Sequence, residues 1–287
     1  MWPLKRPRFT GTAFANWRNR KWVFWMGVHN LTSRRTQKRL PQTDRLIPGF
    51  HALEEGLRQK QNPIQEIWVA EGKKSERISR IIRTASAKNI PIHFKQTTEI
   101  TELLSNKNHQ GIIGVIRRFE YADFQAIKRQ SLKSGPSALL LAADHITDSG
   151  NLGALIRTAA FFGTHGLMIP KDRSAGITGA VFKRASGTHF QLPIAKVTNL
   201  GRTLDELAKV GFWIIGAAGE ASTVHYEFDW KRPVVLVLGS EQRGLSQSVR
   251  KRCHEVVRIP SPGGVESLNI SVAGGVILSE ICRQRQR

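Results

Sequence analysis

Along the first part of the chain, the spacing of the hydrophobic residues switches between a helical period and the alternation of a strand. This pattern predicts short helices and strands in turn. Apolar residues stand at helical spacing in Phe50, Leu53 and Leu57, and the next apolar stretch alternates residue by residue as a strand does. The predicted elements of this part are the stretches 49–59, 64–70, 77–87, 90–94, 98–104 and 111–116. Together they predict a small α/β unit over 46–118.

The second part of the chain opens on 138–144, a continuous apolar run typical of a strand that is buried on both faces. Further strands are predicted at 166–169, 212–216, 234–239 and 255–259, with helices at 151–163, 204–210 and from about 269 onward. Such alternation predicts a mostly parallel sheet with helices on its faces over 137–287. The polar stretch 119–136, which closes with Ser-Gly-Pro, is interpreted as a linker.

Charge indicates the kind of partner. The 287 residues carry a formal net charge of +22, and such a surplus suits a polyphosphate partner because cationic side chains release counterions condensed on nucleic acid. Residues 1–45 hold eleven Lys and Arg against Asp44 alone, yet the remaining chain still carries +12. The segment 1–45 is interpreted as a basic, disordered leader, with an RNA-gripping arm, a transit peptide or a true start at Met26 as alternatives.

Several protein classes are excluded by what the sequence lacks. No apolar run approaches the roughly 18–20 residues of a membrane span, so a soluble protein is expected. Cys253 and Cys282 are too few for a disulfide framework and favour a reducing compartment. The nine His show no HxxxH spacing, so no metal site is expected. GxGxxG, GK[ST] and GxSxG motifs do not occur, which argues against the usual dinucleotide, Walker and hydrolase sites.

Three polar, glycine-containing clusters, at 144–158, 238–246 and 259–269, each follow a predicted strand of the second unit. Because ligands of parallel sheets bind beyond the carboxyl ends of the strands, these clusters are expected to form one composite site. Taken singly, their residues leave two interpretations open. Asn151 and Asn269 suit helix caps, and Arg157 suits a solvated helix face, but the same side chains could also hold a ligand.

In this order the clusters resemble the signature motifs of the SpoU (TrmH) family of RNA 2'-O-ribose methyltransferases. "NLGALIRTA" resembles motif 1, "LVLGSEQRGLS" motif 2 and "IPSPGGVESLNISVA" motif 3. "PKDRSA", "GAAGEA" and "NHQGI" are similar to the subfamily that modifies a guanosine ribose in 23S rRNA. The resemblance covers 47–285 and leaves only the leading segment outside it.

The resemblance implies a fold and a chemistry. It implies a SPOUT-type α/β-knot catalytic domain, whose C-terminal part threads a trefoil knot, preceded by a ribosomal-protein-like α/β substrate-binding domain. It further implies an S-adenosyl-L-methionine-dependent enzyme that works as a homodimer in rRNA processing, without metal or membrane. The expected compartment is the cytoplasm, or an organelle if the source is eukaryotic.

By the same resemblance, one set of residues lines the cofactor pocket: Gly219, Leu238, Gly239, Ile259 and Leu268. A second set is catalytic: Asn151, Arg157, Glu241, Ser267 and Asn269. Since a guanidinium stays protonated in proteins, Arg157 is expected to clamp a phosphate and stabilise the developing alkoxide, with the proton leaving to phosphate or water. Glu241 is expected to fix its loop or to pair with Arg157, and Ser267 and Asn269 to fix the ends of the motif 3 loop.

Two alternatives stay open at this stage. A non-catalytic RNA-binding or ribosome-assembly protein could use the same scaffold, and a tRNA 2'-O-methyltransferase could use the same chemistry. RNA contact is also expected in the first unit, at its loop 106–111 and at a group of basic residues: Lys73, Lys74, Arg77, Arg80 and Arg83.

Overall fold

The computed structural model describes residues 45–59, 62–104, 109–186, 188 and 191–286. The predicted leader lies outside these residues except for Arg45, and so does half of the predicted RNA-binding loop 106–111, namely 106–108. The described chain contains two β-sheets, and each is considered by itself.

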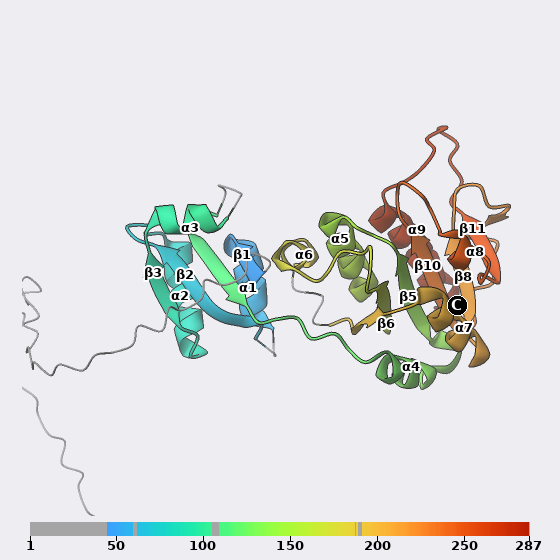
Figure 1. The fold of residues 1–287 in the computed structure, drawn as a ribbon, viewed down its shortest axis with the longest axis horizontal. Helices are drawn as coiled ribbons and strands as arrows, with labels where there is room; N and C mark the ends of the chain where they lie inside the picture. The colour runs from blue at the N-terminus through green and yellow to red at the C-terminus, as the bar shows by residue number, and fades with distance from the viewer. Residues whose placement is uncertain (1–44, 60–61, 105–108, 187, 189–190, 287) are drawn as a thin grey trace, which may run out of the picture. The chain divides into compact units, whose positions relative to one another are not determined.

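The smaller sheet has four strands in the order β1-β4-β2-β3 (Figure 1). β2 runs parallel to β3 and antiparallel to β4, which also pairs antiparallel with β1. Its elements are β1 (Leu46–Pro48), α1 (Phe50–Arg58), β2 (Ile64–Ala70), α2 (Glu76–Ala87), β3 (Ile92–Lys95), α3 (Thr97–Leu103) and β4 (Ile112–Ile116). The six predicted elements of this unit are confirmed. β1 was not predicted, because three residues are too few to show a period.

Alternation along β4 explains why helices cover both faces of the smaller sheet. Ile112 and Ile116 are buried in a cluster with residues of α1 and α2, whereas Ile113 and Val115 are buried with Ile100 of α3 on the other face. Successive side chains of a strand point to opposite faces, so one strand contributes to two cores.

The larger sheet has seven strands in the order β7-β6-β5-β10-β8-β11-β9, and all its pairings are parallel, as the sequence predicts. The strands are β5 (Leu139–Asp144), β6 (Gly166–Pro170), β7 (Ile194–Val197), β8 (Trp213–Ala217), β9 (Thr223–Val224), β10 (Val234–Gly239) and β11 (Glu255–Arg258). The predicted strands are confirmed within about two residues. β7 and β9, with four and two residues, were missed.

Helices cover both faces of this sheet and form a three-layer arrangement. Leu139 and Leu141 of β5 are buried with residues of α5 and α9, whereas Leu140 and Ala142 are buried with residues of α4, α7 and α8. The helices are α4 (Phe124–Leu132), α5 (Ser149–Phe161), α6 (Gly179–Ala185), α7 (Leu200–Lys209), α8 (Gln247–Arg250) and α9 (Ile270–Arg285). β5 is therefore buried on both faces, as its unbroken apolar run predicts.

Part of the segment interpreted as a linker, 119–136, is helical. α4 begins after Asp123, whose side chain accepts a hydrogen bond from the Ala126 backbone N–H at 3.0 Å, and it buries Ile127 against the larger sheet. With so few buried apolar residues in the helix, its periodicity is too weak to recognise in the sequence. The domain boundaries at 118 and 137 stay predictions.

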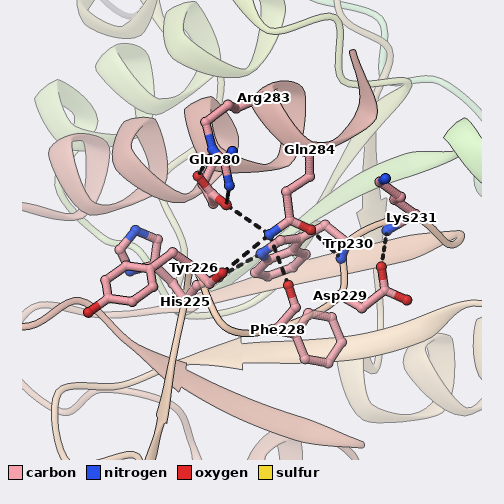
Figure 2. Close-up of polar contacts among 9 residues, drawn as sticks. All are labelled: His225, Tyr226, Phe228, Asp229, Trp230, Lys231, Glu280, Arg283 and Gln284. Carbon is pink, nitrogen blue, oxygen red and sulfur yellow. Dashed lines mark hydrogen bonds and ion pairs between the residues drawn. The ribbon is translucent and has the colours of Figure 1, made fainter. Parts of the chain in front are cut away.

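The C-terminal half of α9 is fastened to the segment that precedes β10 (Figure 2). Gln284 accepts a hydrogen bond from the Trp230 backbone N–H at 3.0 Å and donates one to the Phe228 carbonyl at 3.0 Å. The guanidinium of Arg285 donates to the carbonyls of Trp230, Ser137 and Arg232 at 3.0, 2.7 and 2.7 Å. These bonds fix the position of α9, and hence of the loop before it.

None of the helices in the described ranges combines the length and apolar character of a membrane crossing.

Candidate active site

Three loops from distant parts of the sequence meet at a triangle of polar side chains. The Asn151 amide donates to one Glu241 carboxylate oxygen at 2.7 Å. The Asn269 amide donates to the other Glu241 oxygen and to the Asn151 side-chain oxygen, both at 2.8 Å. These residues follow β5, β10 and β11, so the prediction of one composite site is supported by direct contacts.

The helix that carries Asn151 begins earlier than expected. α5 starts at Ser149, and its cap is Asp148, whose carboxylate accepts the Asn151 backbone N–H at 2.7 Å. The interpretation of Asn151 as the helix cap is therefore wrong. Since Asp148 satisfies that backbone group, the Asn151 side chain is free to contact Glu241 and Asn269.

Asn269 has both of the roles that the sequence left open. Its side-chain oxygen accepts the Ser271 backbone N–H at 3.0 Å and so caps α9, while its amide belongs to the triangle. Glu241 assists the cap, because it also accepts the Ile270 backbone N–H at 3.3 Å. Ser267 is exposed and, within the described part of the chain, its side chain makes no hydrogen bond.

Arg157 lies exposed on α5, two turns beyond Asn151. Its guanidinium donates to the Ser186 hydroxyl at 3.2 Å, and no carboxylate pairs with it among the described residues. Of the two roles expected of Glu241, pairing with Arg157 is not observed, because the Glu241 carboxylate accepts hydrogen bonds from Asn151 and Asn269. The remaining N–H groups of Arg157 can reach a ligand.

Asp144, at the end of β5, is a site residue that sequence reasoning missed. It is only 1% exposed, and its carboxylate accepts the Ser246 backbone N–H at 2.6 Å. Its other oxygen lies 2.6 Å from a ring nitrogen of His145. The available signal was an acidic residue that closes a fully apolar strand, since a buried carboxylate needs such partners. Asp144 ties the end of β5 to the loop that carries Glu241.

A cavity of about 850 Å³ opens beside the triangle, at the carboxyl ends of β8, β10 and β11. All five residues predicted for the cofactor pocket line it: Gly219, Leu238, Gly239, Ile259 and Leu268. Glu241 and Ser267 also line it, whereas Asn151, Arg157 and Asn269 do not. Ala217, Val265, Ala273 and Ile277 belong to the lining and were not predicted.

The lining suits a nucleoside-like cofactor of a few hundred daltons. The volume lies within the usual range of about 300–1,000 Å³ for small-molecule sites, and the wall combines aliphatic side chains with bare backbone. Gly239 is indispensable to this shape, since a Cβ there would lie 2.1 Å from the carbonyl carbon of Gly244. At Gly219 a Cβ would come no closer than 3.4 Å to any neighbour, so that wall is open.

The wall of the cavity also contains charged residues, whereas Cys253 lies outside its lining. Backbone hydrogen bonding and the ion pair with Arg250 lower the pKa of Glu220, which lines the cavity. Burial raises the pKa of the Cys253 thiol to about 11, so it stays protonated at neutral pH. Among the described residues no group of three His, Cys, Asp or Glu side chains is arranged to hold a metal ion.

The basic residues predicted to meet RNA in the smaller unit differ in their availability. Arg77 donates to Glu54 at 2.9 and 2.8 Å, and Arg80 lies 3.5 Å from Glu76. Lys73, Lys74 and Arg83 are exposed, and no carboxylate pairs with them in the described ranges. The ion pair with Glu54 reduces the positive charge that Arg77 can offer to a phosphate.

Known proteins share both parts of this architecture. Residues 138–279 match the model of the SpoU rRNA Methylase family, and residues 46–122 match the RNA 2'-O ribose methyltransferase substrate-binding domain. The crystal structure of the SpoU methyltransferase AviRb from Streptomyces viridochromogenes has a TM-score of 0.67 at 24% identity, covering 84% of this chain and 89% of that one. That likeness concerns the fold.

Curated relatives extend the match over nearly their whole length. The 23S rRNA (guanosine-2'-O-)-methyltransferase RlmB of Pseudomonas aeruginosa is 38% identical over 239 residues, which are 83% of this chain and 96% of that protein. The protein of the same name from Coxiella burnetii is 39% identical over 240 residues, 84% and 96% of the two chains. With the substrate-binding and methylase regions matched in order, the chain belongs to the SpoU rRNA methylase family.

Proposed function

We propose that this protein transfers a methyl group from S-adenosyl-L-methionine to the 2'-hydroxyl of a guanosine ribose in 23S rRNA. The observation that carries the proposal is the convergence of Asn151, Glu241 and Asn269 beside a cavity lined by all five expected cofactor contacts. The relatives that cover most of the chain are named for this reaction, and AviRb is described in complex with AdoMet. The high net charge of +22 agrees with an RNA substrate.

The chemistry requires alignment more than covalent catalysis. The cofactor would supply an electrophilic methyl group on a sulfonium, and the protein must hold the ribose oxygen in line with it. Gly239 and Gly219 would admit the cofactor through close backbone approach, with Leu238, Ile259 and Leu268 against its apolar surface. The polar triangle would keep the motif 1, 2 and 3 loops in register.

Arg157 would hold the RNA at the reacting ribose. Its planar guanidinium binds a phosphate through two N–H groups at once and stabilises negative charge that develops on the hydroxyl oxygen. Because a guanidinium does not deprotonate in proteins, the proton would leave to a phosphate oxygen or to water.

The proposal includes two finer expectations. The first is a trefoil knot formed by the C-terminal part of the chain, with the motif 3 loop 259–269 and α9 as its threaded segments. The second is a homodimer formed through α5 and α9. Phe161 on α5 is 82% exposed and Val272 on α9 is 50% exposed, and such apolar residues on two helices that pack together suit a second copy of the same chain. The expected compartment is the cytoplasm.

The test is in vitro methylation of an unmodified 23S rRNA transcript, with 2'-O-methylguanosine measured by mass spectrometry. Arg157→Lys keeps the charge but loses the two-pronged geometry, so we expect turnover at least 100-fold below wild type, with S-adenosyl-L-methionine affinity within twofold by calorimetry. Arg202→Lys, on the exposed face of α7, is the matched control. Wild-type turnover of Arg157→Lys would remove the role given to Arg157.

The same assay separates the alternatives. Methylation of tRNA transcripts instead of 23S rRNA would favour a tRNA enzyme, for which one set of relatives, named tRNA/rRNA methyltransferases, leaves room. Absence of S-adenosyl-L-methionine binding would favour a non-catalytic RNA-binding protein.

A further inference from the structure

The carboxyl edge of the larger sheet is divided into two halves with different surfaces. Loops after β8, β10 and β11 line the cofactor-sized cavity, whereas loops after β5, β6 and β7 do not. Four residues that carry or can carry a positive charge stand at or just beyond the ends of the latter strands and are called the cationic edge: His145, Lys171, Arg173 and Lys196. The two halves are contiguous, because β5 pairs with β10.

Backbone contacts bring these residues together. The Ala175 backbone N–H donates to the Ile146 carbonyl at 2.8 Å, so the loop with Arg173 lies beside the loop with His145. Lys196 lies against the same loop, since its ammonium nitrogen is 3.7 Å from where a Cβ on Gly176 would stand. The three loops thus form one continuous surface.

The charges of this surface are largely unpaired. Within the described residues, Lys171, Arg173 and Lys196 form no ion pair with a carboxylate, and the His145 ring has a polar contact with the buried Asp144. That contact uses the Nδ1 atom, so Nε2 can donate to a phosphate oxygen where it carries a proton. The ammonium of Lys196, which is half-buried, lies 4.8 Å from the centre of the Tyr121 ring. Two further carboxylates lie close to these residues in the sequence: Asp148, which caps α5, and the exposed Asp172. The balance favours an anionic ligand.

Backbone strain is concentrated in the same region. Three residues of the larger unit other than glycine have positive φ angles within the described ranges: His145 at 59°, Arg173 at 53° and Ser186 at 50°. The first two belong to the cationic edge, and the third accepts the hydrogen bond from Arg157. Residues other than Gly, Asn, Asp and His rarely adopt this conformation, so Arg173 adopts it at a cost that glycine would relieve. An Arg in this conformation, beside a His in the same conformation, supports a binding role for this edge.

From these observations we propose that the cationic edge, led by His145 and Arg173, holds phosphates of the RNA substrate on the side of the sheet away from the cofactor cavity. This rests on the proposed function and adds to it the surface on which the RNA backbone lies. Asp144 links the two halves, because one of its oxygens holds the ring of His145 and the other holds the Ser246 backbone beyond Glu241. RNA bound at the edge would then run toward the polar triangle.

The test uses the full-length protein, a 23S rRNA transcript and a salt titration of RNA affinity. Arg173→Gly removes one cation and relieves the positive φ. We expect RNA to bind at least fivefold more weakly, and the slope of log affinity against log salt to fall by about one. The melting temperature should stay equal to that of wild type or rise, and S-adenosyl-L-methionine affinity should not change.

Lys171→Ala is the second variant and is expected to show the same loss of RNA affinity and slope, which keeps the test decisive if Arg173→Gly folds poorly. Lys209→Ala is the matched control, because it removes an exposed cation before the amino end of β8. Wild-type RNA affinity in both edge variants, or an equal loss in Lys209→Ala, would overturn the proposal. Because binding is measured without turnover, a wild-type protein that methylates no RNA would count against the proposed function alone.

Discussion

At the scale of single residues, the site depends on side chains whose hydrogen-bond donors and acceptors pair with one another. Glu241 is exposed but accepts three hydrogen bonds, from the amides of Asn151 and Asn269 and from the Ile270 backbone. Each of these partners belongs to a different part of the site: motif 1, the end of the motif 3 loop and the first turn of α9. The Glu241 carboxylate is therefore better described as a group that holds the loops together than as a group that reacts.

This predicts the outcome of Glu241→Gln. The substitution replaces one carboxylate oxygen by an NH2 group, which then faces either the Asn151 donor or the Asn269 and Ile270 donors. One or two hydrogen bonds are therefore lost, and the remaining donors meet a neutral acceptor instead of a charged one. We expect kcat/KM for methylation to fall at least tenfold, which corresponds to about 1.4 kcal/mol. Steady-state kinetics with Gln242→Ala as the neighbouring control would check this, and unchanged kinetics would contradict the assigned role.

The sequence predicted which residues of the site meet, but not which hydrogen bonds each of them makes. Motif spacing placed Asn151, Glu241 and Asn269 at strand ends, which is enough to bring them together in a parallel sheet. It could not show that Asp148 rather than Asn151 caps α5, because either residue type serves as a cap. Nor could it show that Asp144 is a tie between loops, since that depends on the Ser246 backbone more than one hundred residues away.

At the scale of elements, α9 connects the site to the base of the sheet. The first residue of α9 follows Asn269. Ala273 and Ile277 of this helix line the cavity, and Gln284 and Arg285 hold its last turn through hydrogen bonds. Hydrogen bonds between Glu280 and Arg283, shown in Figure 2, support the same end and lower the pKa of Glu280 to about 2. The position of the cavity wall therefore depends on contacts at the far end of this helix.

The substitution Glu280→Gln tests whether the ionised Glu280 stabilises the C-terminal end of α9, because that contribution depends on pH. The folded-state pKa of Glu280, about 2, lies below its ordinary value of 4.5, so the carboxylate contributes stability above pH 4.5. That contribution is lost as pH falls from 4.5 through about 2. We expect the wild-type free energy of unfolding to decline more steeply over this window than that of Glu280→Gln, measured by denaturant unfolding at several pH values. Parallel curves for the two proteins would show that Glu280 adds nothing.

At the scale of the whole molecule, five strands of the larger sheet and three of its helices followed from the pattern, whereas the other elements of this part did not. β5, β6, β8 and β10 were visible because each is a mostly apolar run of at least five residues, and β11 was visible through its pair Val256 and Val257. α6 and β7 were not recognised, because seven and four residues give little periodicity and their burial depends on neighbours distant in sequence.

Association of two copies belongs to this scale as well. Phe161→Asp places a charge on the exposed apolar part of α5, which should oppose burial against a second chain without disturbing the core. We expect the dissociation constant of the dimer to rise at least tenfold by sedimentation velocity, and methylation activity to fall with it. Phe94→Asp, an exposed Phe of the smaller sheet, is the control. A monomeric wild-type protein would refute the proposed dimer.

The close approach of Gly239 and Gly244 sets a limit on how this protein can diverge. Elsewhere around the cavity, as at Gly219, there is space for a side chain, and sequence drift can adjust the preference for a ligand. At Gly239 even one methyl group would push two backbone segments apart. We therefore expect position 239 to be restricted to glycine by the space between the two backbone segments, whatever ligand is bound. Changes of ligand preference are expected at positions of the pocket where a side chain fits, such as Gly219.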